Sequence, residues 1–150
     1  EIASLREIAE DAPPTPHDRL EPLEWLIGKW VNEGDDAVVE IEYRWSDDGN
    51  YILADYNIRA NGKQARTSTQ RIGWDPNDQR IRSWLFDTDG GFTHAKWTPT
   101  ENGFLLQSSA VLPSGETGSA VLEFVRDGVG RFTIKGMHRW IAGEQDENFE

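Results

Sequence analysis

Apolar and polar side chains alternate along much of this chain. Val39, Ile41, Tyr43 and Trp45 stand at every second position, with polar or charged residues between most of them. Successive side chains of a β-strand point to opposite sides of a sheet, so this pattern predicts a strand with one buried and one exposed face. The same alternation returns at residues 52–58 and, through Phe132, Ile134, His138 and Trp140, near the end of the chain.

Turn signals rich in Gly, Asn, Asp and Pro separate these stretches at intervals of roughly 12–15 residues. Evenly spaced strands without helices between them predict an all-β, antiparallel up-and-down arrangement of about eight to ten strands. A meander of that length is expected to close into a β-barrel, because closure removes the edge strands. Turns are predicted at residues 47–50, 61–62, 75–78, 89–91, 102–103, 113–115, 127–128 and 142–143.

The start of the chain has a different texture. Prolines at positions 13, 14 and 16 predict a stiff connector, so residues 1–19 are interpreted as a linker or the tail of a preceding domain and residues 20–150 as the barrel domain. Within residues 1–9, apolar side chains at positions 2, 5, 8 and 9 fit a short amphipathic helix or a strand. Leu20, Leu23, Leu26 and Ile27 share one helical face, which predicts a short helix over 20–27 that Gly28 ends before a strand at 29–31.

Charge and composition exclude several functional classes. The 150 residues contain 15 Lys and Arg against 27 Asp and Glu, a net charge of −12 that disfavours nucleic acid and anionic lipid as partners. No apolar run is long enough to insert into a membrane. The lack of cysteine removes disulfides and thiolate chemistry. The compartment cannot be predicted, although a secreted or periplasmic location is slightly favoured, and homo-oligomerisation stays open.

The segment Trp25-Leu26-Ile27-Gly28-Lys29-Trp30 resembles the Gly-x-Trp opening of lipocalin-like barrels. With Ile72-Gly73-Trp74-Asp75-Pro76 and the following residues 82–91, the chain from residue 20 is similar to a bacterial lipocalin-like family of unknown function. The resemblance implies a barrel closed at one end by the helix and plugged by Trp30, and it brings no catalytic residues.

In that family the barrel often follows a nuclear transport factor 2-like (SnoaL-like) domain, and residues 1–7 are similar to the last strand of such a domain. The chain starts at Glu1 without an initiator methionine, so we expect it to belong to a longer or processed protein. A final strand is expected after Asn148-Phe149-Glu150, so the chain is expected to be cut short there.

Aromatic side chains offer the best candidate site. Five tryptophans, at positions 45, 74, 84, 97 and 140, come from different predicted strands and would line or fill an interior. Residues 64–71 are polar on both faces, as expected for an edge strand or for a strand facing a wet lumen. An inward Arg82 would suit an acidic head group, whereas the alternative is that Arg82 faces water and the tryptophans only pack. The predicted ligand-binding residues are Tyr56, Gln70, Trp74, Arg82, Trp84, Phe86 and His138.

His138 falls on the same side of its predicted strand as the inward-facing apolar residues, so it is interpreted as a hydrogen-bonded core or rim histidine. Barrels similar to nitrobindin bind haem through one inward histidine, which makes haem the alternative, and no other cofactor is expected. His17, in the predicted linker, is expected to be exposed, and the three histidines lack the spacing of a metal site. Pairs of carboxylates such as Asp47-Asp48 and Asp87-Thr88-Asp89 fit turn chemistry better than acid–base catalysis.

These observations favour a non-catalytic domain that binds a small apolar or amphipathic molecule, or an accessory domain. The sequence contains no nucleophile elbow, phosphate-binding loop or zinc-protease motif. One alternative is part of an enzyme whose site is assembled from distant strands or by a neighbouring domain. The other is a structural or oligomerisation module.

Overall fold

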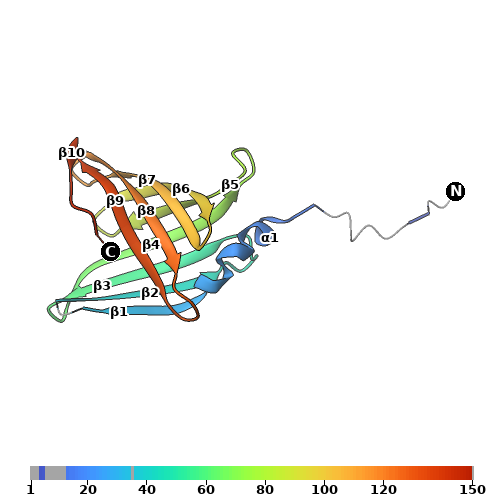
Figure 1. Cartoon of the computed structure of the whole chain (residues 1–150), viewed down its shortest axis with the longest axis horizontal. Helices are drawn as coiled ribbons and strands as arrows, with labels where there is room; N and C mark the ends of the chain where they lie inside the picture. The colour runs from blue at the N-terminus through green and yellow to red at the C-terminus, as the bar shows by residue number, and fades with distance from the viewer. Residues whose placement is uncertain (1–3, 6–12, 35, 150) are drawn as a thin grey trace.

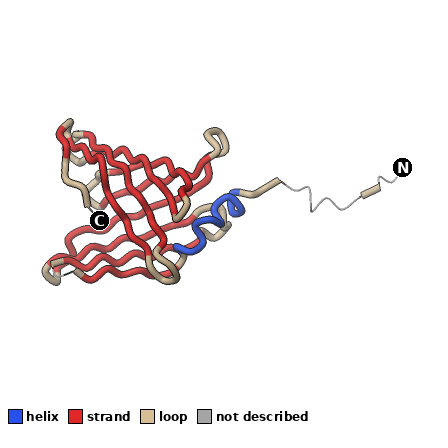
Figure 2. Tube along the Cα trace, in the orientation of Figure 1, coloured by secondary structure: helices blue, strands red, loops and turns tan. Residues whose placement is uncertain are grey.

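The computed structural model describes residues 4–5, 13–34 and 36–149, and its main element is one sheet of ten antiparallel strands. Each strand pairs with the strand that follows it in sequence, so the predicted all-β, up-and-down arrangement is confirmed (Figure 1). Strands account for most of the folded part, as Figure 2 shows. The strands are β1 (Gly28–Glu33), β2 (Ala37–Trp45), β3 (Ile52–Ala60), β4 (Lys63–Asp75), β5 (Arg80–Asp87), β6 (Phe92–Thr100), β7 (Gly103–Val111), β8 (Thr117–Arg126), β9 (Phe132–Ile141) and β10 (Glu144–Gln145).

The eight predicted turns all lie at the connections between successive strands from β2 to β10. Their chemistry is the expected one. The Asp48 carboxylate accepts a hydrogen bond from the Asn50 amide at 3.0 Å, and Asn61 and Gly62 connect β3 to β4 with φ values of 53° and 74°. The connection from β1 to β2, which starts at Gly34, is the one that turn chemistry did not indicate.

Two short helices precede the sheet, α1 (Pro16–Leu20) and the 3₁₀ helix η2 (Glu21–Leu26). The helical region therefore begins before the predicted residue 20, because Thr15 and Asp18 form a capping box with hydrogen bonds of 2.9 and 3.1 Å. No helix in the described ranges is long and apolar enough to cross a bilayer.

Residues 16–19, part of the predicted linker, lie in α1 and contact the sheet. The His17 Nδ1 atom lies 2.7 Å from the carbonyl oxygen of Gly49, and the His17 ring packs on Trp45. His17 is accordingly half-buried, not exposed as its predicted place in a linker implied. Apart from an exposed Leu5, the apolar pattern of residues 2–9 lies outside the described residues, as does most of the segment similar to a SnoaL-like strand.

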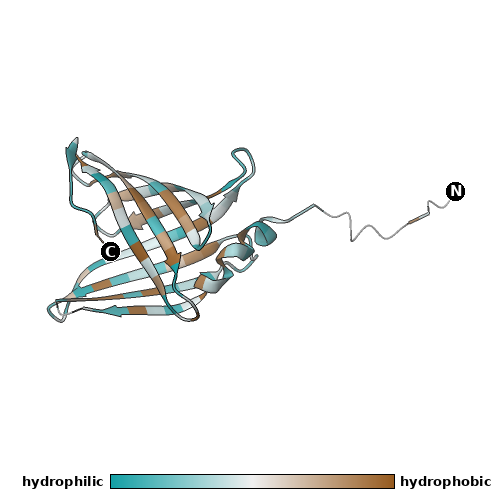
Figure 3. Ribbon diagram, in the orientation of Figure 1, coloured by the Kyte–Doolittle hydropathy of each residue, from teal (hydrophilic) through white to brown (hydrophobic). Residues whose placement is uncertain are grey.

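The core lies between the helices and one face of the sheet, called here the inner face. Leu20, Leu23 and Leu26 of the helices are fully buried, and they pack with inner-face residues of β2 to β8. Figure 3 shows the brown and teal bands that alternate along the strands, as expected when one face is buried. The helices cover one end of the sheet, and the β3–β4 turn lies at the opposite end (Figure 1).

The sheet curves, but its two ends are not hydrogen-bonded to each other. Among the described residues, no backbone hydrogen bond joins β1 to β9 or β10. Side chains make the contact instead, near the helical end, where the rings of Trp30 and Phe132 have centroids 4.7 Å apart. Trp30 is half-buried, and its indole N–H donates a hydrogen bond of 2.6 Å to the Leu26 carbonyl oxygen. Trp30 thus holds the sheet ends and the helix together.

Candidate functional site

Two of the predicted ligand-binding residues, Tyr56 and Gln70, lie on the inner face and contact each other. The Tyr56 hydroxyl donates a hydrogen bond of 2.9 Å to Gln70 Oε1. The hydroxyl of buried Tyr43 lies 2.8 Å from that of Tyr56, so three strands contribute to one polar chain. Of the two alternatives for residues 64–71, the edge strand is wrong, because β4 lies inside the sheet between β3 and β5. Gln70 turns a polar side chain inward and is 8% exposed.

Burial keeps the two tyrosines neutral. It raises the pKa of Tyr56 to about 12, although the hydrogen bond from Tyr43 opposes part of the shift. It also raises the pKa of Tyr43 well above its ordinary value, and the neighbouring Tyr56 adds to the effect. Both hydroxyls therefore act as hydrogen-bonding groups at neutral pH.

A second polar group on the inner face joins β4 to β5. Arg66 makes two hydrogen bonds to the Asp87 carboxylate, 2.7 Å from Nη2 to Oδ2 and 3.3 Å from Nε to Oδ1, and Ser68 donates a further one. The Asp87 side chain is only 7% exposed, whereas that of Arg66 is 51% exposed. The hydrogen bonds to Asp87 raise the pKa of the Arg66 guanidinium, so Arg66 stays charged at neutral pH.

Sequence reasoning missed this group, because Asp87 was assigned to a turn. Only the pairing with β4 shows which way Asp87 points, since Ser68 and Asp87 stand opposite each other in the register. The charges and hydrogen bonds of Arg66, Ser68 and Asp87 satisfy one another. The group therefore stabilises the inner face, and the Arg66 guanidinium is engaged by Asp87.

The predicted inward orientation of Arg82, Trp84 and Phe86 is wrong. In the β4–β5 register, inward Ile72 stands opposite Ser83, so the odd-numbered residues of β5 face inward and these three face outward. Trp84 and Phe86 are 38% and 53% exposed. Arg82, Trp84 and Phe86 do share one face of β5, as predicted. The connection from Asp75 to Arg80 decides which face of β5 meets the core, and alternation alone does not show the geometry of that connection.

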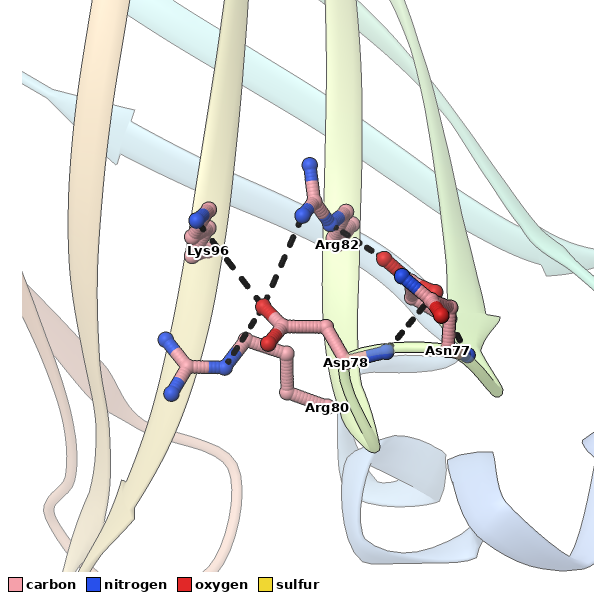
Figure 4. Close-up of polar contacts among 6 residues, drawn as sticks. Asn77, Asp78, Arg80, Arg82 and Lys96 are labelled. Atoms are coloured by element: carbon pink, nitrogen blue, oxygen red, sulfur yellow. Dashed lines mark hydrogen bonds and ion pairs between the residues drawn. The ribbon is translucent and has the colours of Figure 1, made fainter.

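On the outer face Arg82 belongs to a network of ion pairs, shown in Figure 4. Its Nε atom lies 2.6 Å from Asp75 Oδ2, and its Nη2 atom lies 3.5 Å from Asp78 Oδ2. Arg80 and Lys96 approach the same Asp78 oxygen at 3.2 and 3.8 Å. Arg82 is therefore engaged by two carboxylates and is not available to an acidic head group inside the sheet.

The five tryptophans do not converge on one cavity. Trp97 is fully buried and donates a hydrogen bond to Ser83, whereas Trp84 and Trp140 are 38% and 44% exposed. Trp74 is half-buried at the helical end, where the guanidinium of Arg19 lies 5.0 Å from its ring centroid. The remaining one, Trp45, packs on His17. The tryptophans mainly fill the core and cover its ends.

His138 does not point inward, so the predicted inward histidine is wrong. The register between β8 and β9 shifts between Ser119 and Val121, and His138 opposite this bulge has a φ of 49° and an exposed side chain. A bulge reverses the orientation of the residues that follow, which also explains why Trp140 is exposed. The position does not fit haem ligation from inside the sheet.

A cleft of about 560 Å³ opens between β1 and β9, where the two ends of the sheet separate. Its floor is apolar and consists of inner-face side chains from three strands. Among the described residues, Arg131 is the one charged residue that lines it. The floor residues are Trp30 of β1, Val39 and Ile41 of β2, and Phe132 and Ile134 of β9; Val31, Asn32, Gly130, Thr133 and Phe149 complete the lining.

Phe149 forms one wall of the cleft by folding back on β9. Its backbone exchanges hydrogen bonds of 2.7 and 2.9 Å with Gly136. The phenyl ring lies directly over Gly136, where a methyl group would overlap it, and the Arg139 guanidinium lies 4.9 Å from the ring centroid. The predicted final strand follows residue 150 and does not include Phe149. The pairing of Phe149 with Gly136 of β9 gives no periodic signal in the sequence.

The fold and the cleft define a class: an all-β protein with one curved antiparallel sheet, open along one side and covered by helices at one end. No model of a known protein family matches this chain, and no curated protein is similar to it in sequence.

Proposed function

We propose that this chain is a non-catalytic binding domain that holds an apolar or amphipathic ligand in the cleft between β1 and β9. The observation that carries the proposal is the cleft itself. Five inner-face residues at the margin of the core form the floor of an open space of about 560 Å³. Small-molecule sites typically have volumes of roughly 300–1,000 Å³ and mostly apolar walls with a few polar groups.

The charge at the cleft supports an amphipathic acid rather than a base. Arg131 is exposed at the start of β9 and lines the cleft, whereas no carboxylate does so among the described residues. A ligand with an apolar body on Trp30 and Phe132 and a carboxylate beside Arg131 would match this arrangement. Arg131 thus takes the role that the sequence suggested for Arg82.

Membership of the lipocalin-like family and closure of the sheet into a barrel stay part of the proposal. The helical end cover, Gly28 and Trp30 occur in the expected order, and side chains of Trp25 and Trp30 meet Phe132 across the gap, with ring centroids 5.5 and 4.7 Å apart. A secreted or periplasmic location, a bacterial source and an adjoining SnoaL-like domain are likewise predictions.

An oligomerisation module is the second candidate, favoured by a patch on the outer face. Phe86 and Phe92 stand opposite each other on β5 and β6, and with Trp84 they expose 53%, 45% and 38% of their surface. Exposed aromatic side chains on neighbouring strands are typical of protein interfaces. Sedimentation equilibrium tests this candidate, since a dimer that dissociates in the Phe92→Ala variant would support it.

The binding proposal is tested by titrating the protein with decanoate in competition with a fluorescent apolar anion, 1-anilinonaphthalene-8-sulfonate. Phe149→Ala removes one wall of the cleft. Phe92→Ala is the matched control, because the two phenylalanines are similarly exposed, 43% and 45%, but Phe92 lies on the outer face. Loss of about half of a buried phenyl contact, about 1 kcal/mol, weakens binding about fivefold.

We expect decanoate to displace the fluorophore from the unaltered protein and from Phe92→Ala, and to bind Phe149→Ala about fivefold more weakly. Arg131→Gln is expected to weaken decanoate but not decanol. Equal effects of Phe149→Ala and Phe92→Ala, or no binding of any probe, would contradict the proposal.

A further inference from the structure

The cleft is bordered on one side by an unpaired strand edge. The Gly34 amide donates a hydrogen bond of 2.9 Å to Ala37, so Gly34 and every second residue before it in β1 direct their backbone groups at β2. In an antiparallel ladder the intervening residues point the other way. The N–H and C=O groups of Lys29, Val31 and Glu33 therefore point away from β2, and of these three residues Val31 lines the cleft. No backbone partner for these groups exists among the described residues.

The opposite border is a second unpaired edge, formed by the first half of β9. The Asp127 amide donates a hydrogen bond of 2.9 Å to the Arg131 carbonyl oxygen. The backbone N–H and C=O groups of the odd-numbered residues in this part of β9 therefore point toward β8. Gly136 directs both of its backbone groups away from β8, at Phe149. By the same alternation, Phe132 and Ile134 direct theirs into the cleft, and the described part of the chain supplies no strand to pair with them.

We propose that the natural ligand of the cleft is an extended peptide segment that inserts as a β-strand between β9 and β1. This inference rests on the proposed function, because it names the class of ligand for the same cleft. An organic molecule on the apolar floor would leave both backbone edges unpaired. A peptide strand would bond to both, so it alone uses every feature of the cleft.

The direction of the strand follows from the meander. Because successive strands alternate in direction, β1 and β9 run the same way, and one strand antiparallel to β9 is also antiparallel to β1. The segment that precedes the cleft already runs in this direction, since Glu144, Gln145 and Phe149 pair with Ile141, Trp140 and Gly136 in one constant register. An inserted strand would continue that line along Ile134, Thr133, Phe132 and Arg131.

This placement sets the chemistry of the partner. Residues opposite Ile134 and Phe132 point to the inner face, so they lie on the apolar floor and should be apolar, while the residue between them faces solvent. The carboxyl end of an antiparallel strand reaches Arg131, which directly precedes β9 and is the one charged residue that lines the cleft in the described part of the chain. The partner that fits is therefore the carboxyl-terminal tail of another protein chain, with alternate apolar side chains and a free terminal carboxylate.

The test uses the peptide acetyl-Ile-Thr-Val-Ser with a free carboxylate and the ¹⁵N-labelled full chain. The control peptide carries N-methyl groups on its Ile and Val, which keeps side chains and charge but blocks the bonds to Phe132 and Ile134. We expect the unmodified peptide to slow amide hydrogen exchange at Val31, Phe132 and Ile134, and to bind at least tenfold more tightly than the methylated one. A peptide with an amidated end is expected to bind about fivefold more weakly, because it cannot pair with Arg131.

A pair of protein variants tests the β1 edge. Because the Val31 N–H points away from β2, Val31→Pro removes a donor from the cleft without breaking the β1–β2 ladder. Val31→Thr keeps the donor and a β-branched side chain. Peptide binding should weaken in Val31→Pro and persist in Val31→Thr.

The outcomes separate the two proposals. If decanoate binds and the tetrapeptides do not, or if N-methylation has no effect, the strand inference is overturned and the proposed binding function stands. If neither decanoate nor any tetrapeptide binds, both proposals are overturned.

Discussion

Replacement of Trp30 by alanine should destabilise the protein by about 4 kcal/mol. The variant loses the hydrogen bond to the Leu26 carbonyl, about 1 kcal/mol. It also loses edge-to-face contacts with Trp25 and Phe132, at centroid distances of 6.4 and 4.7 Å, which contribute about 1 kcal/mol each. Burial of the half-exposed indole adds about 1–2 kcal/mol. The total lies within the range of about 3–5 kcal/mol typical of Trp→Ala substitutions in a core.

Equilibrium unfolding in urea, followed by far-ultraviolet circular dichroism, measures this loss. Trp30→Phe keeps a ring between Trp25 and Phe132 but not the hydrogen bond, so its loss should be about 1–2 kcal/mol. Trp84→Ala is the control on the outer face, where a side chain that is 38% exposed should cost about 1 kcal/mol or less. If Trp30→Ala costs no more than Trp84→Ala, Trp30 does not join the two ends of the sheet.

Three further predictions concern the inner face and the C-terminal segment. Burial raises the pKa of Tyr56 to about 12, so this tyrosine stays neutral in the folded protein up to about that pH. The contribution of neutral Tyr56 to the free energy of unfolding is therefore complete below about pH 10. About 3 kcal/mol in all is lost as the pH rises from about 10 to 12. In urea unfolding, Tyr56→Phe should lose less stability over this pH range than the unaltered protein does. Gly136→Ala places a methyl group where the Phe149 ring lies, so it should displace the ring and weaken decanoate binding as Phe149→Ala does; unchanged binding would contradict this. Asp87→Ala leaves Arg66 without its carboxylate partner and should cost about 2 kcal/mol in urea unfolding, less than a fully buried pair because Arg66 is half-exposed.

Alternation and turn chemistry were sufficient to predict the architecture, because both are local properties of the chain. The inward set Val39, Ile41, Tyr43 and Trp45 and the eight turns were read from neighbouring residues alone. The helices begin before the predicted residue 20, because Thr15 and Asp18 form a capping box. This box overlaps the proline-rich stretch, which predicts a connector rather than a helix.

The candidate site depended on non-local geometry, which alternation does not contain. The orientation of Arg82, Trp84 and Phe86 was set by the register that follows the β4–β5 connection, and that of His138 by a bulge. The inward orientation of Tyr56 and Gln70 does follow from alternation, because the one register shift between β3 and β4 lies outside the stretch from Ile52 to Tyr56 and from Ser68 to Ile72. Neither residue lines the cleft.

The cleft could not be predicted at all from local patterns. It exists because two strands distant in sequence, β1 and β9, approach at the helical end and separate beyond it. Neither Phe132 nor Ile134 differs in its local pattern from a fully covered core residue. Only the three-dimensional arrangement shows that their backbone edge is unpaired.

The most direct test of the central claim is a map of amide chemical-shift changes in the ¹⁵N-labelled protein during titration with decanoate. If the cleft is the binding site, the largest changes will lie at Val31, Phe132, Ile134 and Phe149, with little change at Phe86 and Phe92 on the outer face. Changes centred on Phe86 and Phe92, or no saturable change at any residue, would contradict a binding site between β1 and β9.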